Sequence, residues 1–286
     1  MSLLACSIRN IGRHIVKPFA VVGAGTPILS RLNPILSIIT ARLAPVGSVL
    51  YEQIYIEGVK CERTTPASPT NTVIVYFHGG GFFFGSPKGH RPITTRLALQ
   101  TRATVISVDY TLGTYGPAEI EAEKVVRKVL EDNSSVVIAG DSAGGNLAVH
   151  CGHIFGGQVK AVAAISPWLD LRRQKLTFKD PIISTSAINT AARQYLKTTP
   201  PIRACKYRCK GTNLHNTKVI LHYCDDEILA KGIRMLVSNL QDKAARPIVR
   251  EYKGLFHVFQ ILGGILPEAN KAMRDLSADI LNAIND

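Results

Sequence analysis

Short apolar runs alternate with longer amphipathic ones along this 286-residue chain. The short runs are rich in β-branched residues, as strands buried on both faces of a sheet are. They span residues 51–57, 72–78, 103–110, 135–140, 159–166, 217–223 and 247–252. Between them, apolar residues recur at helical spacing in residues 117–130, 144–154, 228–242 and 267–284. The alternation predicts an α/β fold with a mostly parallel sheet and helices on both faces, in which functional residues follow the carboxyl ends of strands.

The segment after the fourth apolar run carries a serine in a distinctive setting. Residues 140–144 read Gly-Asp-Ser-Ala-Gly, which matches G-x-S-x-G with a predicted strand before it and a predicted helix after it. The glycines permit a sharp turn that lifts Ser142 clear of the sheet. The following helix directs its positive end at the group that the serine attacks. This context predicts that Ser142 is a nucleophile.

A serine hydroxyl needs a base to remove its proton, and a histidine stands where such a base is expected. His257 lies in the segment "YKGLFHVFQIL", after the last predicted strand and before the last predicted helix. A histidine among apolar residues is more often structural, but this position agrees with the chain order serine, acid, histidine. We therefore expect His257 to be the general base.

The acid that orients such a histidine should follow the preceding strand, and three carboxylates stand there. Asp225, Asp226 and Glu227 are consecutive in the segment "VILHYCDDEILAKG". One carboxylate would fix the tautomer of the imidazole and stabilise the imidazolium that forms. The other two suit the start of a helix or a solvated loop. Composition alone does not choose among the three.

Three consecutive glycines end the second apolar run, in the segment "VIVYFHGGGFFFGS" over residues 73–86. Glycine loses more backbone entropy on ordering than any other residue, and a plain turn needs only one or two. When Ser142 attacks a carbonyl group, the oxygen becomes an anion that needs amide donors, and side chains would block its approach. The glycines therefore predict one side of an oxyanion hole, and the amide of Ala143 supplies another.

Together these motifs resemble the hormone-sensitive-lipase-like branch of the α/β hydrolases, a group of esterases and lipases with HGGG and GDSAGG motifs. The resemblance runs from about residue 73 to the C-terminus and is carried by "HGGGFFFGS", "GDSAGGNLA", "ISPWLDL" and "GLFHVFQIL". It implies the α/β-hydrolase fold. It also implies that the acid is Glu227, with Asp226 as second choice, because the family's acid stands two residues before a leucine.

The same resemblance implies which residues form the oxyanion hole and which residues surround the site. It implies that the donors are the amides of Gly80, Gly81 and Ala143, with His78 and Gly79 supporting the loop. Phe82 and Phe83 would border the acyl pocket, although packing in the core explains both residues equally well. A small cap would be built from residues 1–50 and from a basic insertion at about 172–216, leaving a hydrolase domain over residues 51–286. The chain departs from the family after Asp109 and Tyr110, where "TLGTYGPAE" replaces a longer loop and alters the pocket wall.

The net charge of the chain indicates which kinds of partner it could bind. The formal net charge is +13, and residues 172–218 hold eleven Lys and Arg against one acid. No zinc spacing, aromatic ribonucleoprotein motif or arginine-glycine repeat accompanies this charge, so we expect no nucleic-acid partner. We interpret the basic surface mainly as that of a soluble enzyme, with peripheral association with a membrane left open. The first 29 residues are too interrupted by charge to span a membrane, but an amphipathic helix there could lie on a membrane or cover the site.

The six cysteines are too scattered for a disulfide framework. Cys205 and Cys209 are four residues apart without histidines at zinc spacing, so free thiols and a cytoplasmic location are expected. We expect no metal and no cofactor. Pairing of two copies through an edge strand also stays open.

These observations predict a serine carboxylic ester hydrolase that acts on short-to-medium acyl esters through an acyl-enzyme. Two alternatives remain. One is an acyltransferase or amide hydrolase with the same triad, and the other is a ligand-binding protein with this fold that does not catalyse.

Overall fold

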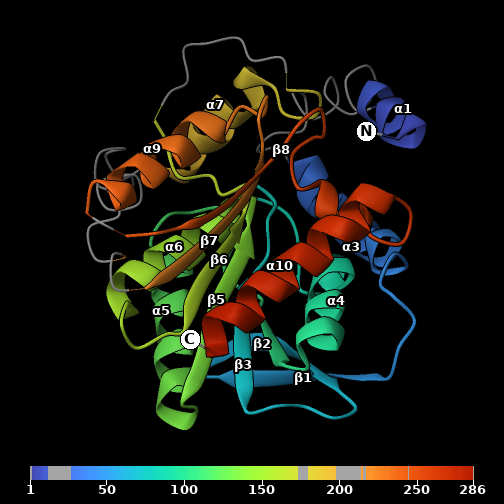
Figure 1. Cartoon of the computed structure of the whole chain (residues 1–286). Coiled ribbons are helices and arrows are strands. Elements are labelled where there is room, and N and C mark those ends of the chain that lie inside the picture. The colour runs from blue at the N-terminus through green and yellow to red at the C-terminus, as the bar shows by residue number, and fades with distance from the viewer. Residues whose placement is uncertain are drawn as a thin grey trace.

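The computed structural model describes residues 2–11, 27–172, 180–197, 214, 217–243 and 245–285. Within these ranges, eight strands form one sheet in the order β1-β2-β4-β3-β5-β6-β7-β8 (Figure 1). Their bounds are β1 Val49–Ile56, β2 Val59–Pro66, β3 Thr72–Phe77, β4 Thr104–Val108, β5 Ser135–Asp141, β6 Ala161–Ile165, β7 Lys218–Cys224 and β8 Ile248–Tyr252. The β1–β2 and β2–β4 pairs are antiparallel, and the remaining pairs are parallel. The predicted α/β fold with a mostly parallel sheet is confirmed.

Helices cover both faces of this sheet. Their bounds are α1 Leu3–Ile11, α3 Pro27–Ala41, α4 Arg91–Thr101, α5 Pro117–Asp132, α6 Ser142–Phe155, α7 Thr185–Tyr195, α9 Ala230–Gln241 and α10 Pro267–Asn285, with short 3₁₀ turns η2 Lys88–His90 and η4 Phe259–Leu262. In Figure 1, α4 and α10 lie in front of the sheet, and α5 and α6 lie behind it.

The sheet separates two apolar cores, and alternate residues of β3 pack into different cores. Val73, Val75 and Phe77 pack into the core shared with α5, α6 and α9. Ile74 and Tyr76, at the intervening positions, pack into the core shared with α4 and α10. Successive side chains of a strand point to opposite faces, so a continuously apolar run is what a centrally placed strand requires.

Three described elements were not predicted from the sequence: β2, α4 and α7. Strand β2 alternates buried positions with partly exposed ones and carries Glu62 and Arg63, so it lacks the continuous apolar character of the central strands. It pairs antiparallel with β1, which is also only partly buried. Helix α4 buries threonines and an arginine alongside its apolar residues, and this hides its helical period. Hydrophobic periodicity is a weak guide where polar residues are buried or where a strand lies near the edge of a sheet.

Some predictions concern residues that lie only partly within the described ranges. Most of residues 172–216, together with Cys205 and Cys209, lies outside them. The described parts of residues 1–50 contain α1 and α3. Cys6, Cys61 and Cys224 are free thiols. In the part of the chain that the structure describes, no helix is both long and apolar enough to cross a membrane, and no cluster of side chains is suited to hold a metal ion.

Candidate active site

Ser142 occupies a sharp turn between β5 and α6. Its φ angle is +52°, a left-handed conformation that is unfavourable for a serine and typical of a nucleophile elbow. After the turn, α6 packs so closely against β3 that position 144 must be a glycine. A Cβ atom on Gly144 would lie 2.0 Å from the carbonyl oxygen of Phe77. The amide of Trp168, in the "ISPWLDL" segment, donates to the carbonyl oxygen of Ser142 at 2.8 Å and holds the turn from the other side.

The structure brings Ser142, His257 and Glu227 together from the loops that follow β5, β8 and β7. The Nε2 atom of His257 lies 2.9 Å from the Oγ of Ser142, and its Nδ1 lies 3.2 Å from the Oε2 of Glu227. With the ring proton on Nδ1, the imidazole donates to the carboxylate and accepts from the serine hydroxyl. This arrangement can remove a proton from the hydroxyl while the carboxylate fixes the tautomer.

The environment of this relay shifts two pKa values. Burial alone would lower the pKa of His257, but the hydrogen bond and negative charge of Glu227 outweigh it and raise the pKa above its usual value. Burial raises the pKa of Glu227, and the hydrogen bond from His257 opposes that shift. A histidine whose pKa is raised by its carboxylate is a stronger base toward the hydroxyl.

The three consecutive carboxylates have different surroundings. Glu227 is buried and contacts His257. Asp226 is partly exposed and forms an ion pair with Arg9 of α1. Asp225 accepts a long hydrogen bond, 3.4 Å, from the amide of Gly254. Only Glu227, among these three, lies within hydrogen-bonding distance of the imidazole.

The glycine loop lies between β3 and η2 and turns sharply at Gly80. The amides of Phe83 and Phe84 both donate to the carbonyl oxygen of Gly80 at 3.1 Å. Gly80 has φ +120°, and a Cβ atom there would lie 1.9 Å from the carbonyl oxygen of Phe84. No described acceptor bonds the amides of Gly80 and Gly81, and the amide of Ala143 lies in the first turn of α6, where helix amides lack intrahelical partners. These are the features that an anion-binding loop needs.

Asp141, the residue before the serine, ties the glycine loop to the elbow, a role that the sequence did not reveal. Its Oδ1 accepts from the hydroxyl of Tyr76 at 2.7 Å and from the amide of Gly79 at 2.9 Å. Its Oδ2 lies 3.4 Å from the Nε2 of His90. Burial alone would raise the pKa of Asp141, but His90 and Tyr76 hold it below its usual value. The one available signal was an acidic residue at the end of a mostly apolar strand.

His78 supports the same loop as a neutral group. Its Nδ1 donates to the carbonyl oxygen of Gly79 at 2.8 Å, and its ring stacks on Tyr110 at a centroid distance of 4.4 Å. The hydroxyl of Tyr110 donates to the carbonyl oxygen of His78 at 2.6 Å. Burial and the neighbouring His90 lower the pKa of His78 to about 3. His78 therefore braces the loop without adding charge to it.

The aromatic residues that follow the glycines differ in burial. Phe82 is fully buried and stacks on Tyr195 of α7 at a centroid distance of 3.9 Å, with Trp168 nearby at 5.9 Å. Phe83 is partly buried against the same core, and Phe84 is partly exposed. The structure therefore places Phe82 in the core, which is the packing explanation considered for it.

Asp180 lies just before α7 and contacts the loop that carries Glu227. Sequence analysis did not single this residue out. Its carboxylate is buried and accepts from the amides of Ile182 and Ile183, both at 2.8 Å, and from the amide of Ile228 at 3.0 Å. Because Ile228 follows Glu227 directly, this contact fixes the loop that carries the carboxylate.

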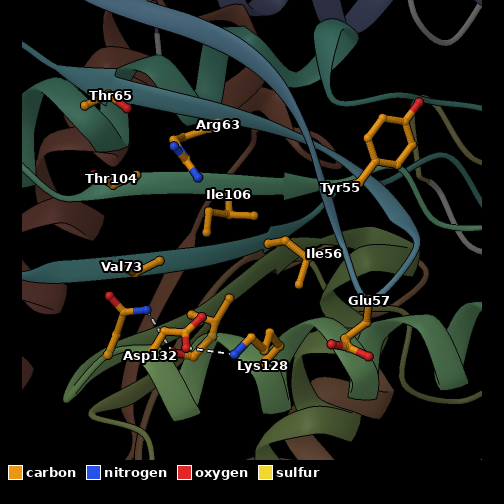
Figure 2. A pocket seen from close by; sticks show the side chains of 12 residues that line it. Tyr55, Ile56, Glu57, Arg63, Thr65, Val73, Thr104, Ile106, Lys128 and Asp132 are labelled. Carbon is orange, nitrogen blue, oxygen red and sulfur yellow. Dashed lines mark hydrogen bonds and ion pairs between the residues drawn. The ribbon is translucent and has the colours of Figure 1, made fainter.

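A cavity of about 680 Å³ lies away from these residues, between the β1–β2 hairpin, the start of β3 and β4, and the end of α5 (Figure 2). Three of its charged residues have partners: Lys128 bonds Asp132 at 2.9 Å, and Arg63 lies 3.7 Å from Glu52. It holds no nucleophile next to a base. We interpret it as a groove left where the hairpin twists away from α5, not as a reaction site.

The fold and the arrangement of Ser142, His257 and Glu227 are those of the α/β hydrolases. Comparison with known proteins makes the assignment more specific. A family model described as "alpha/beta hydrolase fold" matches residues 74–261, and the chain belongs to this family. Of the resemblance inferred from the motifs, membership of the α/β hydrolases is confirmed. Solved structures named as a hormone-sensitive lipase or its homologue share the fold of this chain at 21–22% identity.

Individual relatives agree with the family. The chain is 27% identical to a protein of Acinetobacter venetianus named "Esterase", over 96% of this chain and 93% of the relative. It is also 27% identical to a protein of Streptomyces hygroscopicus named "Acetyl-hydrolase", over 79% of this chain and 80% of the relative. The solved structure of an esterase from the bacterial hormone-sensitive lipase family superposes with a TM-score of 0.86 over 99% of both chains, at 19% identity. That structural likeness shows the fold.

Proposed function

We propose that the protein is a serine carboxylic ester hydrolase that works through an acyl-enzyme. The observation that carries the proposal is the relay of two hydrogen bonds from Ser142 through His257 to Glu227, at an elbow that faces a loop of bare amides. Relatives named esterase and acetyl-hydrolase support an ester as the substrate.

In the first half of the proposed reaction, the Oγ of Ser142 attacks the ester carbonyl as the Nε2 of His257 takes its proton. Glu227 stabilises the imidazolium. The carbonyl oxygen becomes an anion that accepts hydrogen bonds from the amides of Gly80, Gly81 and Ala143. The intermediate collapses, the bond to the alcohol oxygen breaks, and His257 donates its proton to that oxygen.

In the second half, a water molecule enters where the alcohol left. His257 removes its proton, the hydroxide adds to the acyl carbon, and the bond to Ser142 breaks as the serine recovers its proton. The same amides stabilise the second oxyanion.

We propose Glu227 as the acid, and Asp226 in a different role. Glu227 contacts the imidazole, whereas Asp226 pairs with Arg9 and so connects α1 to the loop of the acid.

We further propose that short-to-medium acyl chains fit best, beneath a cap formed by residues 1–50 and about 172–216. Phe82 and Tyr195 stack into a fixed aromatic wall behind the glycine loop, and Phe83 lies at its partly buried edge. In this proposal Phe82 shapes the acyl pocket from behind, and Phe83 borders it more directly.

The test combines a kinetic burst with covalent trapping. A short-chain p-nitrophenyl ester should release a burst of nitrophenol equal to the enzyme concentration, and a serine-directed phosphonate should add to Ser142. The Ser142→Ala variant should lose both while keeping the wild-type circular dichroism spectrum. A folded wild-type protein without burst and without adduct would contradict the proposal and favour a ligand-binding role. Identifying the products formed in the presence of a competing amine or alcohol distinguishes hydrolysis from acyl transfer.

A further inference from the structure

Over residues 32–41, the part of α3 whose side chains are described, polar side chains turn toward the protein and large apolar ones away from it. Ser37 is buried with its Oγ 2.7 Å from the Oγ of Ser86. The side chain of Asn33 accepts from the amide of Gly85 at 2.8 Å and donates to its carbonyl oxygen at 2.9 Å. Within residues 32–41, the large apolar residues have 41–55% of their surface exposed, and they are Leu32, Ile35, Leu36, Ile38 and Ile39.

This is the reverse of an ordinary surface helix, which buries its apolar stripe. Leu32, Ile35, Leu36 and Ile39 follow the spacing i, i+3, i+4, i+7, so they form one continuous stripe along α3. We call these four residues and Ile38 the outer face of α3. A contiguous exposed apolar surface of this kind marks a binding surface.

The charge around α3 indicates what binds there. Residues 1–51 contain five Lys and Arg and no Asp or Glu, and of the five Arg9 pairs with Asp226. Arg42 is exposed just after the end of α3, and Lys88 is exposed in η2, which packs against α3. An apolar helix face with cations on the adjoining segments is typical of helices that lie in the plane of an anionic membrane. At 15 residues, α3 is too short to span a bilayer.

We propose that the outer face of α3 docks on an anionic lipid bilayer, with its apolar side chains in the boundary between headgroups and acyl chains. Arg42 and Lys88 lie near the phosphates in this arrangement. Because Asn33 and Ser37 bond Gly85 and Ser86, at the end of the glycine loop, docking places that loop beside the lipid surface. The binding step is independent of the proposed catalytic function.

The experiment uses the catalytically inactive Ser142→Ala protein, so that lipids stay intact. It is sedimented with vesicles of phosphatidylcholine alone or mixed with phosphatidylglycerol. Binding to the anionic vesicles is expected to exceed binding to the neutral ones and to weaken as salt is raised. Adding Ile35→Ser and Ile39→Ser should lower the partition coefficient by about tenfold or more, because two large apolar side chains no longer enter the lipid.

A matched control is Ile120→Ser, which removes an equally large apolar residue, 56% exposed, from α5 on another part of the surface. It should leave vesicle binding unchanged. Thermal unfolding and circular dichroism check that each variant is folded. If the double serine variant does not fold, Arg42→Glu combined with Lys88→Glu provides the second test, and it should weaken binding to anionic vesicles alone.

Two results would overturn the proposal. One is equal sedimentation of the protein with and without anionic vesicles at low salt. The other is a dimer, seen by sedimentation velocity, that Ile35→Ser with Ile39→Ser dissociates. That second result would identify the outer face as a contact between two copies of this chain.

Discussion

Replacing Asp141 by alanine tests whether the glycine loop, the proposed oxyanion hole, depends on the carboxylate that precedes Ser142. In the structure, the Oδ1 of Asp141 accepts two hydrogen bonds inside the protein, from Tyr76 and from the amide of Gly79. Truncation leaves both buried donors without an acceptor, at about 1–3 kcal/mol each, while it removes one buried charge. We therefore expect the free energy of unfolding to fall by about 2–4 kcal/mol.

The effect on catalysis follows from the position of Gly79, which precedes the proposed donors Gly80 and Gly81. If the loop moves enough to misplace one donor, kcat falls by about 10²–10³-fold, which is about 2.7–4 kcal/mol of transition-state stabilisation, with little change in KM. Asp141→Asn keeps an oxygen for Gly79 and offers an N–H to the Nε2 of His90, so kcat should stay within about tenfold. Steady-state kinetics on a short-chain p-nitrophenyl ester and urea unfolding measure the two effects.

Tyr76→Phe is the matched control, because it removes one of the two bonds to Asp141 and leaves the bond to Gly79. It should cost about 1 kcal/mol of stability and leave kcat within about threefold. The reasoning fails if folded Asp141→Ala keeps kcat within about threefold of wild type, since that is less than 1 kcal/mol. It also fails if Tyr76→Phe lowers kcat as much as the alanine does.

Asp141 and His90 together make the free energy of unfolding depend on pH. Burial alone would lower the pKa of His90, but Asp141 outweighs burial and raises it. The stability that His90 contributes is therefore present below about pH 6.5 and is lost as pH rises through the raised pKa. The pKa of Asp141 is lowered, so its contribution is present above about pH 4 and is lost as pH falls through the lowered value. Urea unfolding of Asp141→Asn across pH should lack both changes.

The remaining predictions concern the proposed relay and the glycine turn. Glu227→Gln should lower kcat by about 10⁴-fold, whereas Asp226→Asn should change it by less than about tenfold, and comparable losses would reassign the acid. Because Glu227 raises the pKa of His257, kcat/KM should increase with pH through a midpoint above the ordinary value of about 6.5, and Glu227→Gln should move that midpoint down, which a pH profile measures. Gly80→Ala should lower kcat by about a hundredfold or more, since its Cβ meets the Phe84 carbonyl and φ +120° is strained, and wild-type kinetics in a folded variant would contradict this reasoning.

Part of the site could be predicted from the sequence because its signals are local. Gly140 and Gly144 flank the serine within one short segment, and each is needed because backbone atoms lie within 3 Å of where a Cβ would stand. The strand-turn-helix context around Ser142 is likewise contained in consecutive residues. The position of His257 after the last strand followed from chain order alone, since parallel strands bring their carboxyl ends to one edge of the sheet.

The choice among Asp225, Asp226 and Glu227 was different, because neighbours in sequence can point in different directions in a loop. Sequence alone left all three open, and the family pattern favoured Glu227. The tertiary structure buries Glu227 beside His257 and turns Asp226 toward Arg9, a residue more than two hundred positions away. No local pattern contains a contact of that length.

The sequence alone predicted the alternation of the central strands and helices, the elbow and the glycine turn, because backbone sterics and hydrophobic periodicity act between near neighbours. Only the tertiary structure decided what Asp141 bonds and which way α3 faces. An apolar helix is expected to bury its apolar side, yet α3 is attached through Asn33 and Ser37 to Gly85 and Ser86. Hydrogen bonds between distant segments fixed that orientation, and the apolar stripe was left on the surface as a consequence.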